Sequence, residues 1–133
     1  MKKQTPHGTI ALRVLTTPRD LNPHGTVFGG AMLAYFDIAG AAYAMKNCGN
    51  KVVLASVKEA VFFKPTYQDE QITFYAQTAR IGKTSITVDL EAWRLRPETE
   101  DEPDVVAKAT LVFVAVGKDL RPTPIKIQSD SKE

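Results

Sequence analysis

The hydrophobic residues of this chain recur with two different periods. Residues 28–45 are rich in alanine, and the larger apolar side chains among them are spread around a helix instead of along one stripe. This pattern predicts one long, buried helix. Gly29 and Gly30 can begin it, and Gly49, which follows the polar Asn47, is a plausible end.

Most of the chain after residue 50 alternates between apolar and polar residues, which is the period of a β-strand. The clearest case is residues 85–95, where one set of alternate positions is apolar and the other largely polar, so one face is buried. The pattern predicts five strands, at residues 10–16, 52–63, 71–79, 85–95 and 105–116.

Short connections between these strands favour antiparallel neighbours, because a parallel crossover needs about a dozen residues or more. The predicted fold class is α+β, a five-stranded antiparallel sheet with one long helix on its concave face. The last strand is the most apolar. We expect it to form an exposed edge at which a second copy pairs, giving a homodimer.

Length and charge narrow the possible functions. The chain has 133 residues, 44% of them hydrophobic, and 17 Lys and Arg against 15 Asp and Glu. We expect one domain at residues 1–117 and a basic tail at 118–133 whose last part is disordered. The small positive excess is diffuse and no apolar run could span a bilayer, so neither nucleic acid nor a membrane is an expected partner.

A lone cysteine, Cys48, favours a reducing, cytoplasmic location, and no spacing of Cys and His suggests a metal site.

Three glycines lie within six positions at the start of the predicted helix, namely Gly25, Gly29 and Gly30. Glycine permits positive φ and close approach to the main chain, so another molecule could reach the free N–H groups there. Those groups, at the positive end of the helix dipole, suit a polarised carbonyl oxygen or an anion. The alternative is a tight turn whose glycines serve packing only.

Asp37 lies in the middle of the predicted helix, one turn away from small or apolar residues such as Ala34 and Gly40. A carboxylate there is costly unless it is paired, hydrogen-bonded or used, and small neighbours leave room for a ligand or water. Asp37 is therefore a candidate general base or nucleophile. The alternative is a structural carboxylate bound to a backbone group or a lysine.

Three segments in combination resemble the hotdog-fold acyl-CoA thioesterases. They are the pattern Asn-x-x-Gly-x-x-Phe-Gly-Gly at residues 22–30 followed by the helical Asp37, the strand end at 62–65, and residues 80–86. The resemblance covers about residues 9–118 and is greatest to the group of YciA-like and cytosolic acyl-CoA hydrolases. It implies an antiparallel sheet wrapped around a central helix. It also implies a dimer as the minimal active unit, with a hexamer as a further level of assembly.

The resemblance also implies roles for individual residues. Asp37 matches the catalytic carboxylate, and Asn22 matches an asparagine that acts with it across the dimer interface. Gly29 and Gly30 match the pair whose N–H groups polarise the thioester carbonyl, and the 82–85 turn matches the segment that lies against coenzyme A. Residues expected to bind the substrate or its coenzyme A part are His24, Gly25, Phe28, Lys64, Arg80, Gly82, Lys83, Thr84 and Ser85.

The expected activity is hydrolysis of an acyl-CoA to a free acid and coenzyme A. Asp37 would be the general base, or would attack the thioester directly through an anhydride. No metal or other cofactor is expected, since coenzyme A enters only as part of the substrate. Two alternatives stay open: a hydratase or dehydratase of the same fold, with His24 as its internal histidine, and a non-catalytic acyl-CoA-binding module. Only the thioesterase would release a free thiol.

Overall fold

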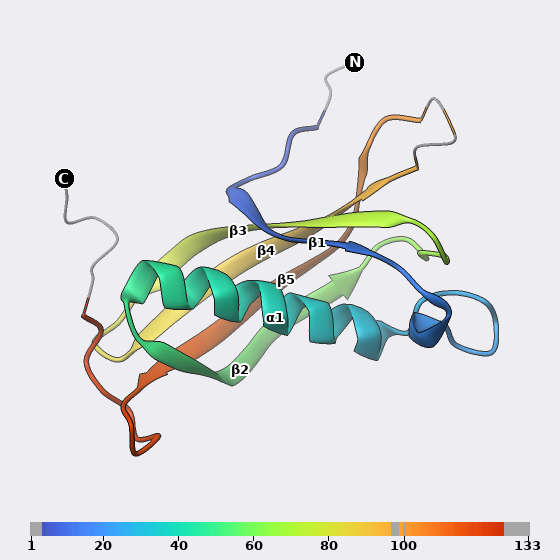
Figure 1. Ribbon diagram of the computed structural model, residues 1–133. Helices are drawn as coiled ribbons and strands as arrows, with labels where there is room; N and C mark the ends of the chain where they lie inside the picture. Colours follow the sequence, from blue (N-terminus) through green and yellow to red (C-terminus); the bar gives the residue numbers. More distant parts are fainter. Residues whose placement is uncertain (1–3, 97–98, 100, 127–133) are drawn as a thin grey trace.

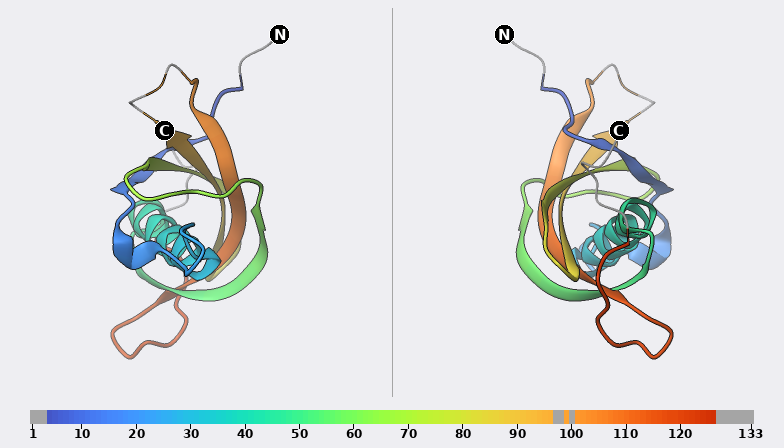
Figure 2. Two further views of the ribbon diagram at one scale, coloured as in Figure 1. Left: turned by 90° about the vertical axis from the view of Figure 1, so that its right-hand side faces the viewer. Right: turned by 90° about the vertical axis from the view of Figure 1, so that its left-hand side faces the viewer.

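A five-stranded antiparallel sheet curls around one long helix, α1 (Gly29–Cys48), as Figures 1 and 2 show. The structure is a computed structural model that describes residues 4–96, 99 and 101–126. The strands are β1 (Thr9–Leu15), β2 (Lys51–Phe62), β3 (Gln71–Ile81), β4 (Ser85–Leu95) and β5 (Asp104–Val116), and a short 3-10 helix, η1 (Pro18–Asp20), precedes α1. The predicted α+β architecture is confirmed.

Helix α1 begins at Gly29 and runs three residues further than the alanine-rich pattern predicts. It ends where Gly49 adopts the left-handed conformation, with φ at 73°, and donates its N–H to the carbonyl of Met45 at 3.0 Å. The expected glycine end is therefore confirmed.

The strand order is β1-β3-β4-β5-β2, with every neighbouring pair antiparallel. The expectation that the last strand forms an exposed edge is wrong, because β5 is hydrogen-bonded on both sides, to β4 and to β2. Its strongly apolar composition fits an interior strand. The two free edges are β1 and β2, and β2 is exposed along most of its length.

The core fills the concave face of the sheet. Phe36 of α1 meets Phe74 of β3 edge to face, with ring centroids 5.2 Å apart. A Cβ at Gly40 would lie only 2.7 Å from the ring of Phe113, so this glycine lets α1 approach β5 closely. The small size of Gly40 is therefore explained by packing against Phe113.

One side of α1 is not covered by the sheet, so the expected burial of the helix is wrong in part. The exposed positions are mostly small or apolar and recur at helical spacing: Gly30, Ala34, Ile38, Ala42 and Met45. We call these five residues the apolar stripe. Ile38 is 55% exposed, and β2 exposes Leu54 and Val57 beside the helix. This chain alone therefore leaves apolar side chains of both α1 and β2 uncovered.

The chain after β5 folds back against the end of the sheet that carries the β3–β4 turn. Thr123 donates its backbone N–H to Ala115 at 2.9 Å, and Ile125 donates to Lys83 at 3.0 Å. Ile125 is buried. The disorder expected for the end of the tail concerns residues 127–133, which lie outside the described residues.

Candidate active site

The start of α1 presents N–H groups to open space. Phe28 is the N-cap residue and provides no side-chain cap, and among the described residues nothing accepts a hydrogen bond from the N–H of Gly29 or Gly30. A Cβ at Gly30 would meet no atom within 4 Å, and one at Gly29 would come no closer than 3.9 Å to the ring of Phe62. Neither glycine has positive φ. Packing within this chain therefore does not explain why glycine occupies positions 29 and 30. The absence of side chains at these two positions leaves the N–H groups of the helix start accessible.

The loop before α1 is shaped by Asn22. Its Oδ1 accepts hydrogen bonds from the backbone N–H groups of His24 at 2.9 Å and Thr26 at 3.2 Å, and its Nδ2 donates to the hydroxyl of Thr26 at 2.8 Å. Gly25 sits inside this turn with φ at 87°, a conformation that favours glycine. Within the described part of the chain, one amide hydrogen of Asn22 has no partner.

Asp37 is half-buried beside the apolar stripe. No hydrogen bond or ion pair joins its carboxylate to any residue that the structure describes. A structural carboxylate would have such a partner, so the alternative interpretation finds no support within this chain. Gly30 lies on the same helix face two turns earlier, which at 1.5 Å per residue is about 10 Å along the axis.

A pocket of about 270 Å³ adjoins Gly29. Its walls are mainly apolar and come from the start of α1, from the end of β2 with the residues after it, and from β5: Val27, Met32, Phe62, Phe63, Lys64, Pro65, Thr66, Val106 and Ala107. Lys64, one of the predicted binding residues, therefore lies near the helix start, where its Nζ pairs with Asp104 at 2.9 Å.

Arg94 holds one wall of that pocket, and the sequence analysis missed it. The side chain is only 5% exposed; Nη1 donates to the carbonyl of Pro65 at 2.7 Å, and Nε and Nη2 donate to Asp104 at 3.2 and 2.8 Å. Burial alone would lower the pKa of Arg94, but Asp104 and Glu70 raise it. The sequence could have identified Arg94 by its position, because the alternation of β4 places this charged residue on the same face as the apolar Leu90.

The predicted coenzyme A-binding turn lies at the other end of the molecule, beside the C-terminal end of α1 (Figure 1). A Cβ at Gly82 would lie 2.8 Å from the hydroxyl oxygen of Ser85, so glycine lets the turn close without displacing that side chain. The turn is braced by Thr84, whose carbonyl accepts the N–H of Ala115 at 2.8 Å. A helix of 20 residues separates it from Gly29, about 30 Å. One chain therefore does not bring Arg80 and the 82–85 turn to the helix start.

The remaining predicted residues lie at the helix-start end. Phe28 exposes 47% of its surface, and the exposed ring of His24 has no partner within the described ranges. His24 therefore lies near Gly29 in the chain but is not paired with a carboxylate, as a hydratase would require.

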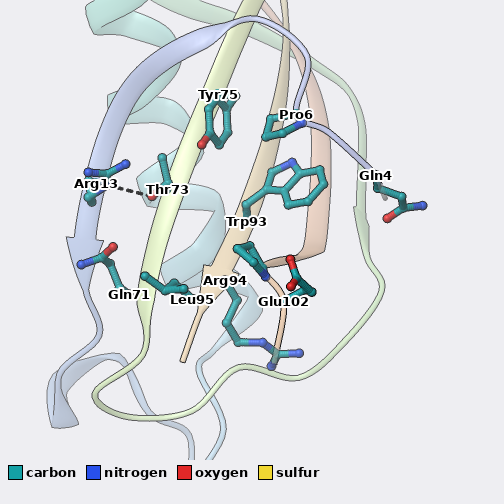
Figure 3. Close-up of a pocket in the computed structure, with 11 residues that line it drawn as sticks. Gln4, Pro6, Arg13, Gln71, Thr73, Tyr75, Trp93, Arg94, Leu95 and Glu102 are labelled. Carbon is teal, nitrogen blue, oxygen red and sulfur yellow. Dashed lines mark hydrogen bonds between the residues drawn. The ribbon is translucent and has the colours of Figure 1, made fainter. Parts of the chain in front are cut away.

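A larger cavity of about 530 Å³ lies on the opposite, outer face of the sheet (Figure 3). Tyr75 and Trp93 line it with ring centroids 6.5 Å apart, and Arg13 donates to the hydroxyl of Thr73 at 2.9 Å. It contains none of the predicted site residues, so size alone does not identify the site.

The described residues contain no group of three or more His, Cys, Asp and Glu side chains that could hold a metal ion. Nor do they include a helix with the length and apolar character needed to cross a membrane.

Known thioesterases are similar to this chain in sequence and in structure. The family described as the thioesterase superfamily matches residues 24–100. The acyl-CoA thioester hydrolase YciA of Salmonella typhimurium is 32% identical over 126 residues, covering 93% of this chain and 95% of that protein. A hexameric hotdog fold thioesterase of Campylobacter jejuni superposes with a TM-score of 0.83 at 31% identity, covering 90% of this chain and 91% of the other.

An acyl-CoA hydrolase of Staphylococcus aureus, solved with butyryl coenzyme A and coenzyme A, has a TM-score of 0.79 at 29% identity, covering 86% of this chain and 69% of the other. Its solved variants replace an asparagine and an aspartate 15 positions apart, the spacing of Asn22 and Asp37 here. A third variant replaces a threonine 17 positions after the aspartate, and the same count reaches the apolar Leu54 in this chain.

Proposed function

Because the chain belongs to the thioesterase superfamily, we propose that it hydrolyses an acyl-CoA thioester to a free acid and coenzyme A. The observation that carries the proposal is Asp37, a half-buried carboxylate without a partner in the described chain, on a helix whose first N–H groups are also free. The names of similar proteins that cover more than nine-tenths of the chain support the same activity.

In the proposed mechanism, the thioester carbonyl oxygen accepts hydrogen bonds from the N–H groups of Gly29 and Gly30. These groups stabilise the negative charge that develops on that oxygen. Asp37 takes a proton from a water molecule, whose oxygen attacks the carbonyl carbon. The carbon–sulfur bond then breaks, and the proton passes from Asp37 to the departing thiolate.

Direct attack by the carboxylate is the competing route. It would form an anhydride between Asp37 and the acyl group, which water then opens. A single turnover in ¹⁸O-water distinguishes the two. General-base catalysis places the label in the acid product, whereas opening of the anhydride at the enzyme's own carbonyl leaves the label on Asp37.

The resemblance to hotdog-fold thioesterases supports a site shared between two copies, because it implies an asparagine that acts with the catalytic carboxylate across a dimer interface. The apolar stripe beside Asp37 and the free edge of β2 are exposed, so a second copy can lie against this side of the helix. We therefore propose that the helix start of one copy works with Asp37 of the other, and that Asn22 acts from the former side.

The surface that would bring two copies together is the free edge of β2 with the apolar stripe of α1. Pairing of two β2 edges would satisfy their open hydrogen-bonding groups and cover Ile38, Leu54 and Val57. A two-fold axis reverses the second copy, which directs its 82–85 turn toward the first copy's helix start. This geometry would join the two groups of predicted residues that one chain keeps apart. The hexameric state of the Campylobacter jejuni protein supports further assembly.

The decisive experiment measures free-thiol release from a series of acyl-CoAs, from acetyl to palmitoyl. Asp37→Asn should lower kcat by about 100- to 10,000-fold without unfolding the protein. The matched control is Asp89→Asn on β4, whose carboxylate accepts a hydrogen bond from Thr110 at 2.7 Å. Equal turnover in the two folded variants would contradict the assignment.

The same assay addresses the other expectations. A hydratase or a binding module would release no thiol. Activity that persists with a strong chelator would support a reaction without metal. A cytoplasmic location is also part of the proposal, supported by the buried, free thiol of Cys48.

A further inference from the structure

Asp20 is a buried carboxylate that the sequence analysis did not single out. It is 8% exposed, and its two oxygens accept hydrogen bonds from the hydroxyl of Tyr35, each at 2.9 Å. The backbone N–H of Thr17 donates to Oδ2 at 2.9 Å. A buried charge needs such partners, and here one of them comes from the second turn of α1.

The backbone of Asp20 closes the loop that carries Asn22. Its carbonyl accepts the N–H of Phe28, the N-cap residue of α1, at 2.8 Å. Leu21 and Val27 form an antiparallel bridge just inside this closure, and the N–H of Val27 donates to Thr66 at 2.8 Å. The same residue thus fixes both ends of the 21–28 loop with its main chain and binds the helix with its side chain.

We propose that Asp20 and Tyr35 form a positioning pair, which holds the 21–28 loop against α1 and thereby sets Asn22 and the helix-start N–H groups in place for catalysis. Its kinetic part rests on the proposed function. Neither side chain is expected to touch the thioester. Burial and the neighbouring carboxylate raise the pKa of Tyr35, so its hydroxyl remains a donor at neutral pH.

Catalysis should respond to a small change at this pair. Donors to a developing oxyanion work at about 2.7 to 3.1 Å, and misplacement by about 1 Å can lower a rate by about 100-fold. Without the Tyr35 hydroxyl, the loop keeps its backbone hydrogen bonds but loses its side-chain link to the helix. The expected result is a displaced loop in a folded protein.

The test compares Tyr35→Phe with Tyr43→Phe. Both tyrosines lie on α1 and each loses one hydrogen-bonded hydroxyl, because Tyr43 contacts the hydroxyl of Thr78 at 2.8 Å near the other end of the helix. We expect Tyr35→Phe to lower kcat by about 10- to 100-fold with a smaller change in KM, and Tyr43→Phe to change neither. Amide hydrogen exchange at Val27 and Phe28 should quicken in Tyr35→Phe only.

The pH profile separates positioning from direct catalysis. In Tyr35→Phe the acid limb of the kcat profile should keep its midpoint while the maximum kcat falls, because the general base, Asp37, is still present. A Tyr35 hydroxyl that transferred protons itself would add an alkaline limb to the wild-type profile, and loss of such a limb in Tyr35→Phe would make Tyr35 catalytic and overturn the proposal. Equal behaviour of the two variants, or a lower kcat without faster exchange, would also overturn it. If the wild-type protein releases no thiol, the proposed function fails, and the exchange comparison alone decides whether the pair holds the loop.

Discussion

Mixing two inactive variants of this chain should restore activity if the site is shared between copies. The first variant removes Asp37 as Asp37→Asn. The second is Asn22→Asp, which keeps an oxygen to accept the hydrogen bonds from His24 and Thr26 and removes the Nδ2 donor. This choice keeps the two hydrogen bonds that Oδ1 accepts in the turn, and the second carboxylate oxygen can accept one from the Thr26 hydroxyl in place of the lost donation, so a loss of activity reflects the missing amide rather than a collapsed loop.

The expected recovery follows from the geometry of a two-fold dimer. Random pairing makes about half of the dimers mixed, and each mixed dimer has two sites. If Asn22 and Asp37 act from different chains, one site of a mixed dimer carries both substitutions and the other carries none. Recovery should therefore approach about one quarter of wild-type activity. If both residues act from the same chain, every site carries one substitution and recovery is absent.

The assay mixes the variants in equal amounts, unfolds and refolds them, and measures thiol release against wild-type protein treated in the same way. Two different affinity tags, purified in sequence, establish that mixed dimers have formed. Activity that stays at the level of the separate variants, with mixed dimers present, would refute the shared site.

Three other predictions follow from the structure. Replacing Arg80 and Lys83 together with alanine should raise KM roughly 2- to 30-fold and weaken its dependence on salt, if these exposed cations meet substrate phosphates; steady-state kinetics at several ionic strengths checks this. Val57→Lys should place an unpaired charge in the proposed interface, at a cost of about 3 to 5 kcal/mol, and yield monomers in sedimentation experiments. Burial alone would raise the pKa of Asp104, but hydrogen-bonded cations, Arg94 foremost, hold that pKa below its usual range. The resulting stabilisation is complete above the unfolded pKa of about 4 and is lost as pH falls through the folded value, so denaturant titrations of Asp104→Asn should show a weaker loss in acid than wild type.

Local patterns were sufficient to predict the elements of the fold. A strand has a period of two and a helix a period near 3.6, so the alternation of residues 85–95 and the alanine-rich run before Gly49 could be interpreted without any partner. Asp37 was identifiable for the same reason, because a charge inside an apolar helix is visible in the sequence. The roles assigned to Asn22 and the helix-start glycines came from resemblance and stay predictions.

Long-range contacts decided the rest. The sequence pattern shows which positions are apolar, but it does not show which part of the structure covers them. Strand β5 lies between two neighbouring strands, whereas the apolar stripe of α1 is not covered by any described part of this chain. The small size of Gly40 is explained by packing against the ring of Phe113. Asp20 meets Tyr35 across 15 residues, and Arg94 meets Pro65 across 29. The sequence by itself determined the helix, the strands and the exceptional carboxylate on the helix. Only the tertiary structure decided strand order, free edges and the partners of buried charges, because these depend on pairings between residues far apart in the chain.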